Sequence, residues 1–550
     1  MHAHDGTPAG ARPPAVVDYG AFQHPPSPLF RDYLTGAKRA SRFYDGGRWD
    51  LDALAASADR AVSLARDRDT LAAALSAQQE GRRAGEAAAR ARQLARPDAV
   101  AVVTGQQAVL LGGPLFVLYK AVAAMTLAAR LEERRGRPVV PVFWVASDDH
   151  DFAEVRSTSV LDEGGQIHTL RYTPQREPVG QPASAVILDE TITAIVEELG
   201  GALPSGPHRD AVVARVAECY RPGESLSGAF ARLLSSLLPG LVVLDPSDAA
   251  LKALMAPVMS RELSERSPTS RLAEEVGRDL LAAGYHQQVP VRPGFLNLFL
   301  ADGERRPLAL DDGQVEVRGT ERRIPLEEAV RAVRSRPEEW SPGVLLRPLA
   351  QDHLLPTAAY VGGPAEIAYH AQIGPSYRHF GIPRPALVPR PSVTVVEPPQ
   401  ARALEAEGLS LSDLQADAEA VLARWAREAY PEVEAAFAST RAALEREMAQ
   451  VADALGQLDP TLRAAADSAL GRALHQIDGL HEKATRALKK RDQTRAERLR
   501  RTRDALLPGG SLQERGLGLV SLLARHGEAI VGEIRERMDP WAKGHQVLFL

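Results

Sequence analysis

Residues 99–121 read AVAVVTGQQAVLLGGPLFVLYKA, and this stretch passes from an apolar run through a glycine loop into a second apolar run. The β-branched residues at 99–104 are typical of a strand that is buried on both faces. Pro114 suits the first turn of a helix, which we expect to span residues 115–135. The next apolar run, VVPVFWVA at residues 139–146, predicts a second strand. Strand, loop, helix and strand form a βαβ unit, so the sequence predicts a parallel sheet with a right-handed crossover.

Other segments extend this α/β core, which we expect to span residues 96–395. Apolar runs at residues 241–245 and 386–390 predict two further strands. Between them, the segments at about 160–215 and 260–345 mix helical and strand-like patterns. We interpret both segments as insertions into the core sheet. The strand-like pattern is clearest in QVEVR, within the second insertion.

The N-terminal residues 1–95 are expected to pack on this core. Residues 1–30 are rich in proline and small residues and predict an extended arm. Residues 50–96 are rich in alanine, arginine, leucine and glutamate and contain no proline. This composition predicts one or two amphipathic helices.

The C-terminal part of the chain predicts a helical hairpin. Prolines recur over residues 383–399 and mark a boundary. Beyond it, apolar residues recur at spacings of three and four on both sides of Asp459-Pro460. These heptad patterns predict an antiparallel coiled-coil hairpin within residues 396–507. Because its helix faces are rich in alanine, the hairpin alone buries little apolar surface, and a second copy would bury more. We therefore expect a homodimer through the coiled coil. Residues 508–550 are expected to dock on the core.

The composition limits the class of protein. The chain has 550 residues, 45% hydrophobic and 25% charged, as expected for a soluble globular protein of several domains. Its formal net charge of −5 does not favour a nucleic-acid or membrane surface, and no apolar stretch reaches the roughly 18 residues of a membrane helix. Cys219 is the only cysteine, which excludes an intramolecular disulfide, and we interpret it as a buried or incidental thiol. The single thiol and the lack of a signal-peptide pattern predict a cytoplasmic protein.

The first glycine loop, residues 104–114, predicts a site for an anion or a nucleotide. Backbone N–H groups around Gly105, Gly112 and Gly113 would lie at the positive end of the following helix, where anions bind. The spacing matches neither the dinucleotide fingerprint nor the GKS or GKT phosphate loop, so a tight structural turn is the alternative. Lys120, in the same helix, would contact a phosphate or else remain solvated.

The pentapeptide SDDHD at residues 147–151 follows the second predicted strand. Ligands of open parallel sheets bind beyond the carboxyl ends of the strands, where this cluster should lie. Its three carboxylates and one histidine could bind Mg²⁺ or act as acid and base. A loop of helix-capping aspartates is the alternative. Zinc is disfavoured because no second histidine or cysteine has a suitable spacing.

Residues 347–375, RPLAQDHLLPTAAYVGGPAEIAYHAQIGP, contain a third candidate site. Gly362, Gly363 and a proline again open a helix-like stretch, in which Glu366 and Tyr369 follow. Such a run of glycine, aromatic and amide residues is unusual for a segment that only packs. We therefore interpret it as a substrate-binding segment, with a structural turn as the alternative.

Together these blocks resemble the BshC family, the cysteine ligases of bacillithiol biosynthesis. The matching motifs follow one another over nearly the whole chain: TGQQ-x5-GP-x4-YK from residue 104, PVFWVASDDHDF from residue 141, RPL-x-QD-x-LLPTAAYVGGP-x-EIAY from residue 347, and SLQER from residue 511. The resemblance implies a Rossmann-like parallel-sheet core with connecting insertions, similar to the cores of class I synthetases and nucleotidyltransferases. It also implies a long antiparallel α-helical coiled coil.

The resemblance further implies the last step of a pathway. In that step the carboxylate of cysteine is joined to the amine of glucosaminyl-malate, which gives the thiol bacillithiol. Activation of a free carboxylate implies ATP, with ADP or AMP as product. The sequence lacks the HIGH and KMSKS signatures of class I synthetases. An adenylate and an acyl phosphate therefore both remain open as the activated intermediate.

Two other functions also remain open. The long hairpin and the missing signatures fit a non-catalytic, nucleotide-binding scaffold of the thiol pathway. The synthetase-like core and the basic helix over residues 489–503 fit an RNA-linked protein.

Residue roles follow from the resemblance as hypotheses. Asp149 would hold the cysteine ammonium or a metal. His150 would bind phosphate or take the proton of the attacking amine, and Lys120 would offset phosphate charge. The remaining candidates would bind nucleotide and substrates: Thr104, Gly105, Gln106, Gln107, Gly112, Gly113, Pro114, Tyr119, Ser147, Asp148, Asp151, Gly362, Gly363, Glu366 and Tyr369.

Overall fold

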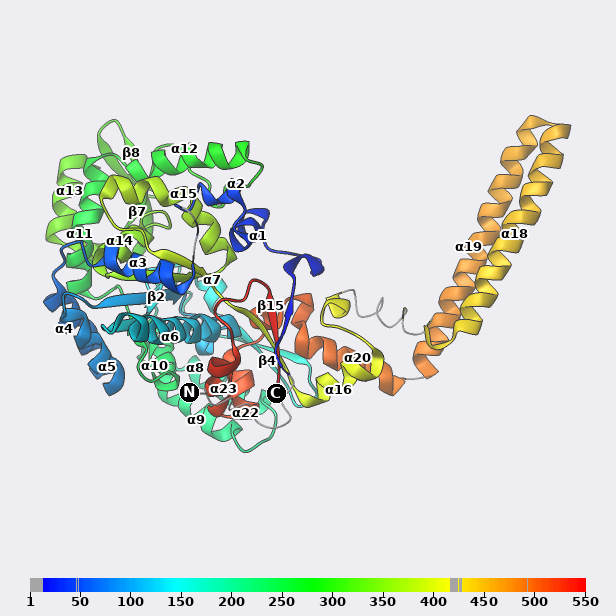
Figure 1. The fold of residues 1–550 in the computed structure, drawn as a ribbon, viewed down its shortest axis with the longest axis horizontal. Helices are drawn as coiled ribbons and strands as arrows, with labels where there is room; N and C mark the ends of the chain where they lie inside the picture. Colours follow the sequence, from blue (N-terminus) through cyan, green and yellow to red (C-terminus); the bar gives the residue numbers. More distant parts are fainter. Residues whose placement is uncertain (1–12, 46, 48, 416–423, 425–427, 492) are drawn as a thin grey trace. The chain divides into compact units, whose positions relative to one another are not determined.

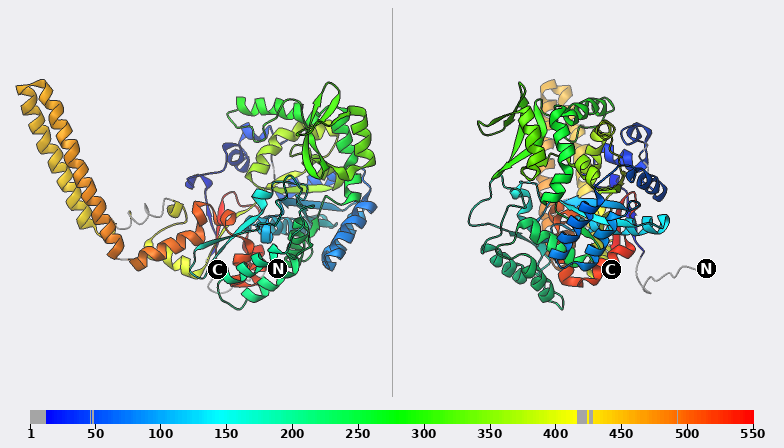
Figure 2. Two further views of the ribbon diagram at one scale, coloured as in Figure 1. Left: turned by 180° about the vertical axis from the view of Figure 1, so that it is seen from behind. Right: turned by 90° about the vertical axis from the view of Figure 1, so that its left-hand side faces the viewer.

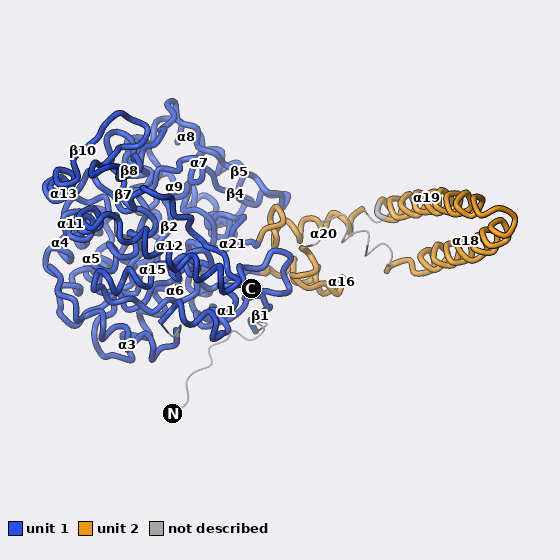
Figure 3. Tube along the Cα trace, turned by 90° about the horizontal axis from the view of Figure 1, so that it is seen from above, with its two compact units in different colours: residues 1–395, 512–550 blue, residues 396–511 orange. Residues whose placement is uncertain are grey.

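The computed structural model describes residues 13–45, 47, 49–415, 424, 428–491 and 493–550. The chain divides into two compact units, one made of residues 1–395 and 512–550 and the other of residues 396–511 (Figure 3). The first boundary lies within the proline-rich stretch that the sequence marks. The second lies after residue 511 instead of residue 507, so the turn that ends the hairpin segment belongs to the helical unit.

A parallel sheet of five strands forms the centre of the first unit (Figure 1). Its order is β13-β12-β2-β3-β6, and each neighbouring pair is parallel. The strands are β2 (Val100–Gln106), β3 (Val139–Val145), β6 (Val242–Leu244), β12 (Thr357–Gly362) and β13 (Ala386–Pro389). Their side chains are buried and mostly apolar, as expected for a sheet covered on both faces, and the predicted parallel core is confirmed. The sequence did not predict β12, because its segment TAAYVG is short and contains two alanines.

Helices connect and cover these strands. α6 (Leu115–Arg135) links β2 to β3 and packs on both, and α15 (Pro364–Phe380) links β12 to β13. Residues 50–96 form three α-helices instead of one or two: α3 (Leu51–Ala61), α4 (Arg68–Gly81) and α5 (Gly85–Arg92). The chain breaks there because the Asp67 carboxylate caps α4 by accepting from the Thr70 N–H, and Arg83 adopts a left-handed φ of 61°.

The two insertions fold as parts of the first unit. Between β3 and β6 lie α7 (Phe152–Val155), β4 (Ser157–Leu161), β5 (Ile167–Arg171), α8 (Thr191–Ala202), α9 (Arg209–Cys219) and α10 (Leu226–Leu237). Between β6 and β12 an antiparallel sheet of order β10-β9-β8-β7-β11 lies with four α-helices (Figure 2). These elements are α11 (Ala249–Ser264), α12 (Pro268–Ala282), β7 (Phe295–Asp302), β8 (Glu304–Asp311), β9 (Gln314–Val317), β10 (Arg323–Pro325), α13 (Leu326–Ser335) and β11 (Trp340–Pro342), and α14 (Arg347–Leu354) follows them.

Segments from both ends of the chain join in a small sheet of order β1-β15-β14, made of β1 (Ala15–Val17), β14 (Ser392–Val396) and β15 (His545–Phe549). The expected arm is not extended throughout, because α1 (Pro28–Thr35) begins within it, and residues 1–12 lie outside the described residues. Residues 512–550 contribute α21 (Gln513–Gly516), α22 (Leu519–His526) and α23 (Ala529–Arg537). The Gln513 side chain accepts from the Val395 N–H and donates to the Val395 carbonyl, so this segment is fixed to the core.

The described part of the second unit is helical, with α16 (Pro398–Glu407), α18 (Pro431–Leu458), α19 (Pro460–Arg491) and α20 (Gln493–Leu506). α18 and α19 pack against each other as an antiparallel pair (Figure 1). At the turn between them, Asp459 accepts from the Thr461 N–H. The packing of the two helices confirms the predicted coiled-coil hairpin. In the ranges that the structure describes, no helix combines the length and apolar composition of a membrane span.

Candidate functional site

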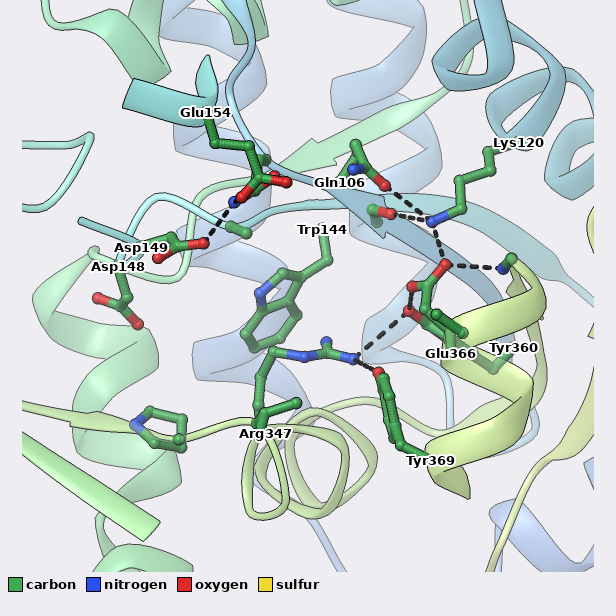
Figure 4. A pocket seen from close by; sticks show the side chains of 18 of the residues that line it. Gln106, Lys120, Trp144, Asp148, Asp149, Glu154, Arg347, Tyr360, Glu366 and Tyr369 are labelled. Carbon is green, nitrogen blue, oxygen red and sulfur yellow. Dashed lines mark hydrogen bonds and ion pairs between the residues drawn. The ribbon is translucent and has the colours of Figure 1, made fainter. Parts of the chain in front are cut away.

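A cavity of about 890 Å³ opens beyond the carboxyl ends of β2, β3 and β12 (Figure 4). Its position is the one that open parallel sheets use for ligands. Of the residues selected from the sequence, the cavity is lined by Gly105, Gln106, Gln107, Lys120, Asp148, Asp149, His150, Gly363, Glu366 and Tyr369. All three sequence blocks therefore contribute to one site.

Lys120 lies in the wall of this cavity and is buried, so the solvated alternative is wrong. Its ammonium donates to the Gly105 carbonyl at 2.7 Å and to Oε1 of Gln106 at 3.0 Å. It also forms an ion pair with the carboxylate of Glu366. Burial lowers the pKa of Lys120, and the facing Glu366 carboxylate opposes that shift. The charge of Lys120 is therefore already balanced by the protein.

Glu366 occupies the first turn of α15 and is held from three directions. Its carboxylate accepts from the Gly363 N–H at 2.7 Å and from the Tyr360 hydroxyl at 2.5 Å, in addition to the ion pair with Lys120. Burial alone would raise the pKa of Glu366, but the ammonium and these hydrogen bonds hold that pKa below its ordinary value. The second glycine segment thus caps its helix with a half-buried carboxylate.

Arg347, at the start of α14, extends into the cavity beside Trp144 (Figure 4). Its guanidinium donates to the hydroxyls of Tyr369 at 3.2 Å and Tyr360 at 3.4 Å, and to Oε1 of Gln351 at 2.9 Å. In the described ranges Arg347 forms no ion pair with a carboxylate. Arg347 opens the RPL motif, but it is not among the site residues predicted from the sequence.

Two further arginines line the same side. Arg390 forms a buried ion pair with Glu514 at 2.8 Å, and its guanidinium lies 5.2 Å from the centre of the Phe116 ring. Arg515 is exposed and, within the described part of the chain, has no ion pair. Glu514 and Arg515 belong to the SLQER motif, so that motif was the available signal for this part of the site.

The opposite side of the cavity is acidic. The Gln107 amide donates to Oδ2 of Asp149 at 2.7 Å and to Oε2 of Glu154 at 2.9 Å, and therefore holds the two carboxylates together. Asp148 is held separately, because the buried ammonium of Lys252 donates to it at 2.7 Å. Figure 4 shows these acidic side chains on one side of Trp144 and the Lys120–Glu366 pair on the other.

His150 also faces this cavity and is half-buried. Its Nδ1 lies 3.3 Å from Nη1 of Arg305, a residue of β8. Burial and the Arg305 guanidinium lower the pKa of His150, while Asp149 and Asp151 oppose the shift. No local motif marks Arg305 in the sequence, because its contact with the SDDHD loop depends on how the inserted sheet folds back.

The phosphate-holding role expected for Gly112 and Gly113 is wrong. The Gly112 N–H donates to the Tyr220 hydroxyl at 3.1 Å, and the Gly113 N–H donates to the Leu110 carbonyl. The first helical N–H that follows them, at Leu115, donates to the carbonyl of Leu517. The N–H groups of both glycines and of Leu115 are thus taken up by protein acceptors.

Several other selected residues also lie outside the cavity lining. Pro114 is the residue before α6 and not part of its first turn, and Tyr119 is fully buried. Thr104 donates to the Val361 carbonyl, Ser147 to the Asp245 carboxylate, and Gly362 packs against Tyr360 and Ile367. Asp151 caps α7 by accepting from the Glu154 N–H, so for this one residue the capping alternative is correct.

The described residues provide no preformed ligand cluster for the Mg²⁺ expected at SDDHD. Over the described ranges, no group of three or more histidine, cysteine, aspartate or glutamate side chains converges as a metal site would require. Asp148 is occupied by Lys252 and Asp151 by its helix cap, so Asp149 is the remaining carboxylate of the pentapeptide.

Comparison with known proteins gives matches over both units. The model of the BshC N-terminal Rossmann-like domain of bacillithiol biosynthesis matches residues 17–391, and the model of the BshC C-terminal coiled-coil domain matches residues 393–550. A Salinibacter ruber protein named "Putative cysteine ligase BshC" is 35% identical, over 98% of this chain and 97% of that protein. Proteins of the same name from Koribacter versatilis and Symbiobacterium thermophilum are 35% and 34% identical, over 92% and 88% of this chain and 94% and 90% of theirs.

Proposed function

The chain belongs to the BshC family of bacillithiol biosynthesis, and from this premise we propose that it is a cysteine ligase that makes bacillithiol. The proposed reaction joins the carboxylate of cysteine to the amine of glucosaminyl-malate, with ATP as the activating substrate. The observation that supports it is the division of charge across the cavity. Asp149 and Glu154 have no lysine or arginine partner within the described ranges, and Arg347 and Arg515 have no carboxylate partner there.

This division of charge suits the proposed substrates. Cysteine carries an ammonium and a carboxylate, and glucosaminyl-malate carries an amine and two carboxylates. The acidic side, with Asp149 and Glu154, would hold an ammonium. Arg347 presents a planar guanidinium, which matches a carboxylate or phosphate through two parallel hydrogen bonds. A cavity of about 890 Å³ is within the usual range for sites that enclose small molecules.

Amide formation from a free carboxylate requires activation, because the carboxylate itself is a poor electrophile. If the cysteine carboxylate attacks the α-phosphorus of ATP, pyrophosphate leaves, and the amine later displaces AMP. If it attacks the γ-phosphorus, ADP leaves, and the amine later displaces phosphate. Mg²⁺ would accompany the nucleotide, held largely by phosphate oxygens, as is usual for this ion. We place the reaction in the cytoplasm, where ATP and reduced thiols are available.

The test is product formation by the full-length protein. Purified protein is incubated with cysteine, ATP, Mg²⁺ and glucosaminyl-malate, and thiol products and nucleotides are measured by mass spectrometry. We expect bacillithiol only when all three substrates are present, and AMP or ADP then identifies the activated intermediate. Arg347→Met should remove this activity, whereas Arg378→Met, an exposed arginine outside the cavity, should keep it. Nucleotide binding without thiol product would contradict the ligase and support the scaffold.

We also propose that the hairpin joins two copies of the chain. Val451, Leu458 and Leu480 are apolar side chains on α18 and α19 with exposed fractions of 44%, 80% and 59%. Exposed apolar side chains on a heptad-patterned surface are the features that a partner helix would cover.

A further inference from the structure

Arg305 is fixed in place by the inserted antiparallel sheet. Its guanidinium lies 3.7 Å from the centre of the Phe299 ring on β7. Its Nε donates to the Ser341 hydroxyl at 2.9 Å, and its Nη2 donates to the Pro342 carbonyl at 3.0 Å, both on β11. One stacking contact and two divergent hydrogen bonds determine the plane of a guanidinium completely, because its N–H groups have fixed directions. These three contacts therefore also fix the direction in which the remaining Nη1 points.

Nη1 points at the SDDHD loop and lies 3.3 Å from Nδ1 of His150. A guanidinium only donates hydrogen bonds and does not lose its proton in proteins. Nδ1 of His150 must then be the acceptor, and the single proton of the neutral imidazole is placed on Nε2. The competing partner of Nδ1 is Oδ1 of Asp149, which at 3.8 Å lies beyond hydrogen-bond distance.

The loop that carries His150 is itself held, so this arrangement is not a loose surface contact. The Asp149 carbonyl accepts from the Ala183 N–H at 2.8 Å, and the Ser147 carbonyl accepts from the Ser184 N–H at 3.0 Å. These bonds come from the first insertion, whereas Arg305 comes from the second. Both insertions of the core thus fix the position of His150.

We propose that Arg305 is a positioning residue that holds His150 as the Nε2–H tautomer, so that His150 donates a hydrogen bond to an anionic oxygen of the ligand instead of accepting a proton. The proposal rests on the proposed function only for the source of that oxygen, a carboxylate of the cysteine or a phosphate of ATP. The neighbouring guanidinium also disfavours an imidazolium, which is consistent with a neutral ring. The proton that the attacking amine loses then goes to a carboxylate, and Asp149 and Glu154 line the same side of the cavity.

The tautomer can be measured without any ligase activity. In the full-length protein with ¹⁵N-labelled histidine rings, the His150 signals are assigned by their loss in His150→Gln. Above neutral pH we expect an unprotonated Nδ1 and a protonated Nε2. Arg305→Met should convert this pattern to a tautomer mixture or to Nδ1–H. Arg306→Met, the adjacent arginine that pairs with Glu304 outside the cavity, should leave it unchanged. A parent protein with Nδ1–H, or an Arg305→Met variant with the parent pattern, would overturn the proposal.

The chemical role is tested by two substitutions of His150. Glutamine places an amide N–H near the position of Nε2 but cannot accept a proton, and leucine can do neither. We expect His150→Gln to ligate within about tenfold of the parent, since one hydrogen bond is retained, and His150→Leu to be clearly slower. A general base would instead make both variants slower by about 10²- to 10⁴-fold, and that result would overturn the donor role. A raised KM for ATP or for cysteine in His150→Leu identifies the oxygen as phosphate or carboxylate. A parent without thiol product defeats the proposed function, while the ring spectra still decide the tautomer.

Discussion

The buried ammonium of Lys120 forms an ion pair with the half-buried carboxylate of Glu366, although 246 positions separate them in the sequence. Lys120 belongs to α6, which follows β2, and Glu366 belongs to α15, which follows β12. β2 and β12 are parallel neighbours in the central sheet. The two glycine-containing segments are therefore equivalent connections from adjacent strands, and the ion pair joins them in the wall of the cavity.

Removal of one partner should leave an unpaired buried charge. We expect Glu366→Gln to lower the free energy of unfolding by about 3 kcal/mol, because a buried cation without its counterion is strongly unfavourable. Chemical denaturation measures this change. Glu275→Gln is the matched control, since its pair with Arg271 is exposed and should contribute less than about 1 kcal/mol. Equal small losses in both variants would show that the Lys120–Glu366 pair contributes little to stability.

Gly113 should matter for the fold and not directly for nucleotide binding. Its φ of 72° is in the glycine region, and a Cβ there would lie 2.9 Å from Cβ of Val109. We expect Gly113→Ala to lower stability by about 1–3 kcal/mol. Gly136→Ala is the milder control and should lose less stability, because Gly136 has a left-handed helical ψ of 24° and open space around the added Cβ, whereas Gly113 has a ψ of −168°. Calorimetric titration with ATP, below the melting temperature, should give the parent affinity for both variants. A selective loss of ATP affinity in Gly113→Ala would restore the phosphate-loop interpretation.

The sequence predicts the fold well where one physical pattern dominates a segment. Continuous apolar runs identify β2, β3 and β13, and three–four spacing on both sides of Asp459-Pro460 identifies the hairpin. Whether the N–H groups of Gly112 and Leu115 are free could not be predicted, because their acceptors, the Tyr220 hydroxyl and the Leu517 carbonyl, come from distant segments. A glycine loop predicts a turn, but the partners of its N–H groups are a tertiary property.

The cationic side of the site was not predicted from the sequence, because arginine is so frequent in this chain. Lysine and arginine together number 66 and only seven are lysine, so an arginine in this sequence carries little information by itself. Arg305, Arg347 and Arg390 acquire their roles from partners in other segments: His150, the two tyrosines at 360 and 369, and Glu514. The acidic pentapeptide was conspicuous in the sequence, but the structure assigns different partners to Asp148, Asp149 and Asp151.

The proposed homodimer predicts that added charge on the hairpin separates the two copies. Truncating the chain near Pro399 would not test the dimer cleanly, because it would also remove residues 512–550, which belong to the core unit. Val451→Glu combined with Leu480→Glu should convert a dimer into a monomer, since both exposed apolar side chains would be buried by a partner. Light scattering of the full-length protein measures the mass. Gln450→Glu, at an exposed polar position of α18, is the control for added charge. A double variant that remains dimeric would place the interface elsewhere.

His545 should make the protein less stable in mild acid. Burial, reinforced by Arg390 and opposed by Glu514, lowers the pKa of His545 from 6.5 to about 4, where its ring bonds Ser392 and Thr394. The unfolded chain takes up this proton as the pH falls through about 6.5, whereas the folded protein does so only near pH 4. The resulting loss is absent above pH 6.5, reaches about 2 kcal/mol at pH 5 and is complete, at about 3 kcal/mol, below pH 4.

A substitution separates this group from the rest of the acid response. The difference in unfolding free energy between pH 7 and pH 5 should be smaller in His545→Gln by about 2 kcal/mol. The exposed His24, replaced in the same way, should leave that difference unchanged. An unaltered pH dependence in His545→Gln would mean that the buried ring titrates near its ordinary value.

Asp149 and Asp151 lie two residues apart but should have separate effects on chemistry and on stability. Asp149 faces the cavity and accepts from Gln107, whereas Asp151 accepts from the Glu154 N–H as the cap of α7. Asp149→Asn keeps the size and can still accept from Gln107, so the melting temperature should stay near that of the parent. Its charge, which would hold an ammonium or accept a proton, is lost, and bacillithiol formation should fall at least about tenfold. Asp151→Ala should show the reverse, a loss of about 0.5–2 kcal/mol in stability with ligation unchanged. If Asp149→Asn ligates at the parent rate, the charge that acts on the amine belongs to Glu154, because Gln107 holds that carboxylate against the same side of the cavity.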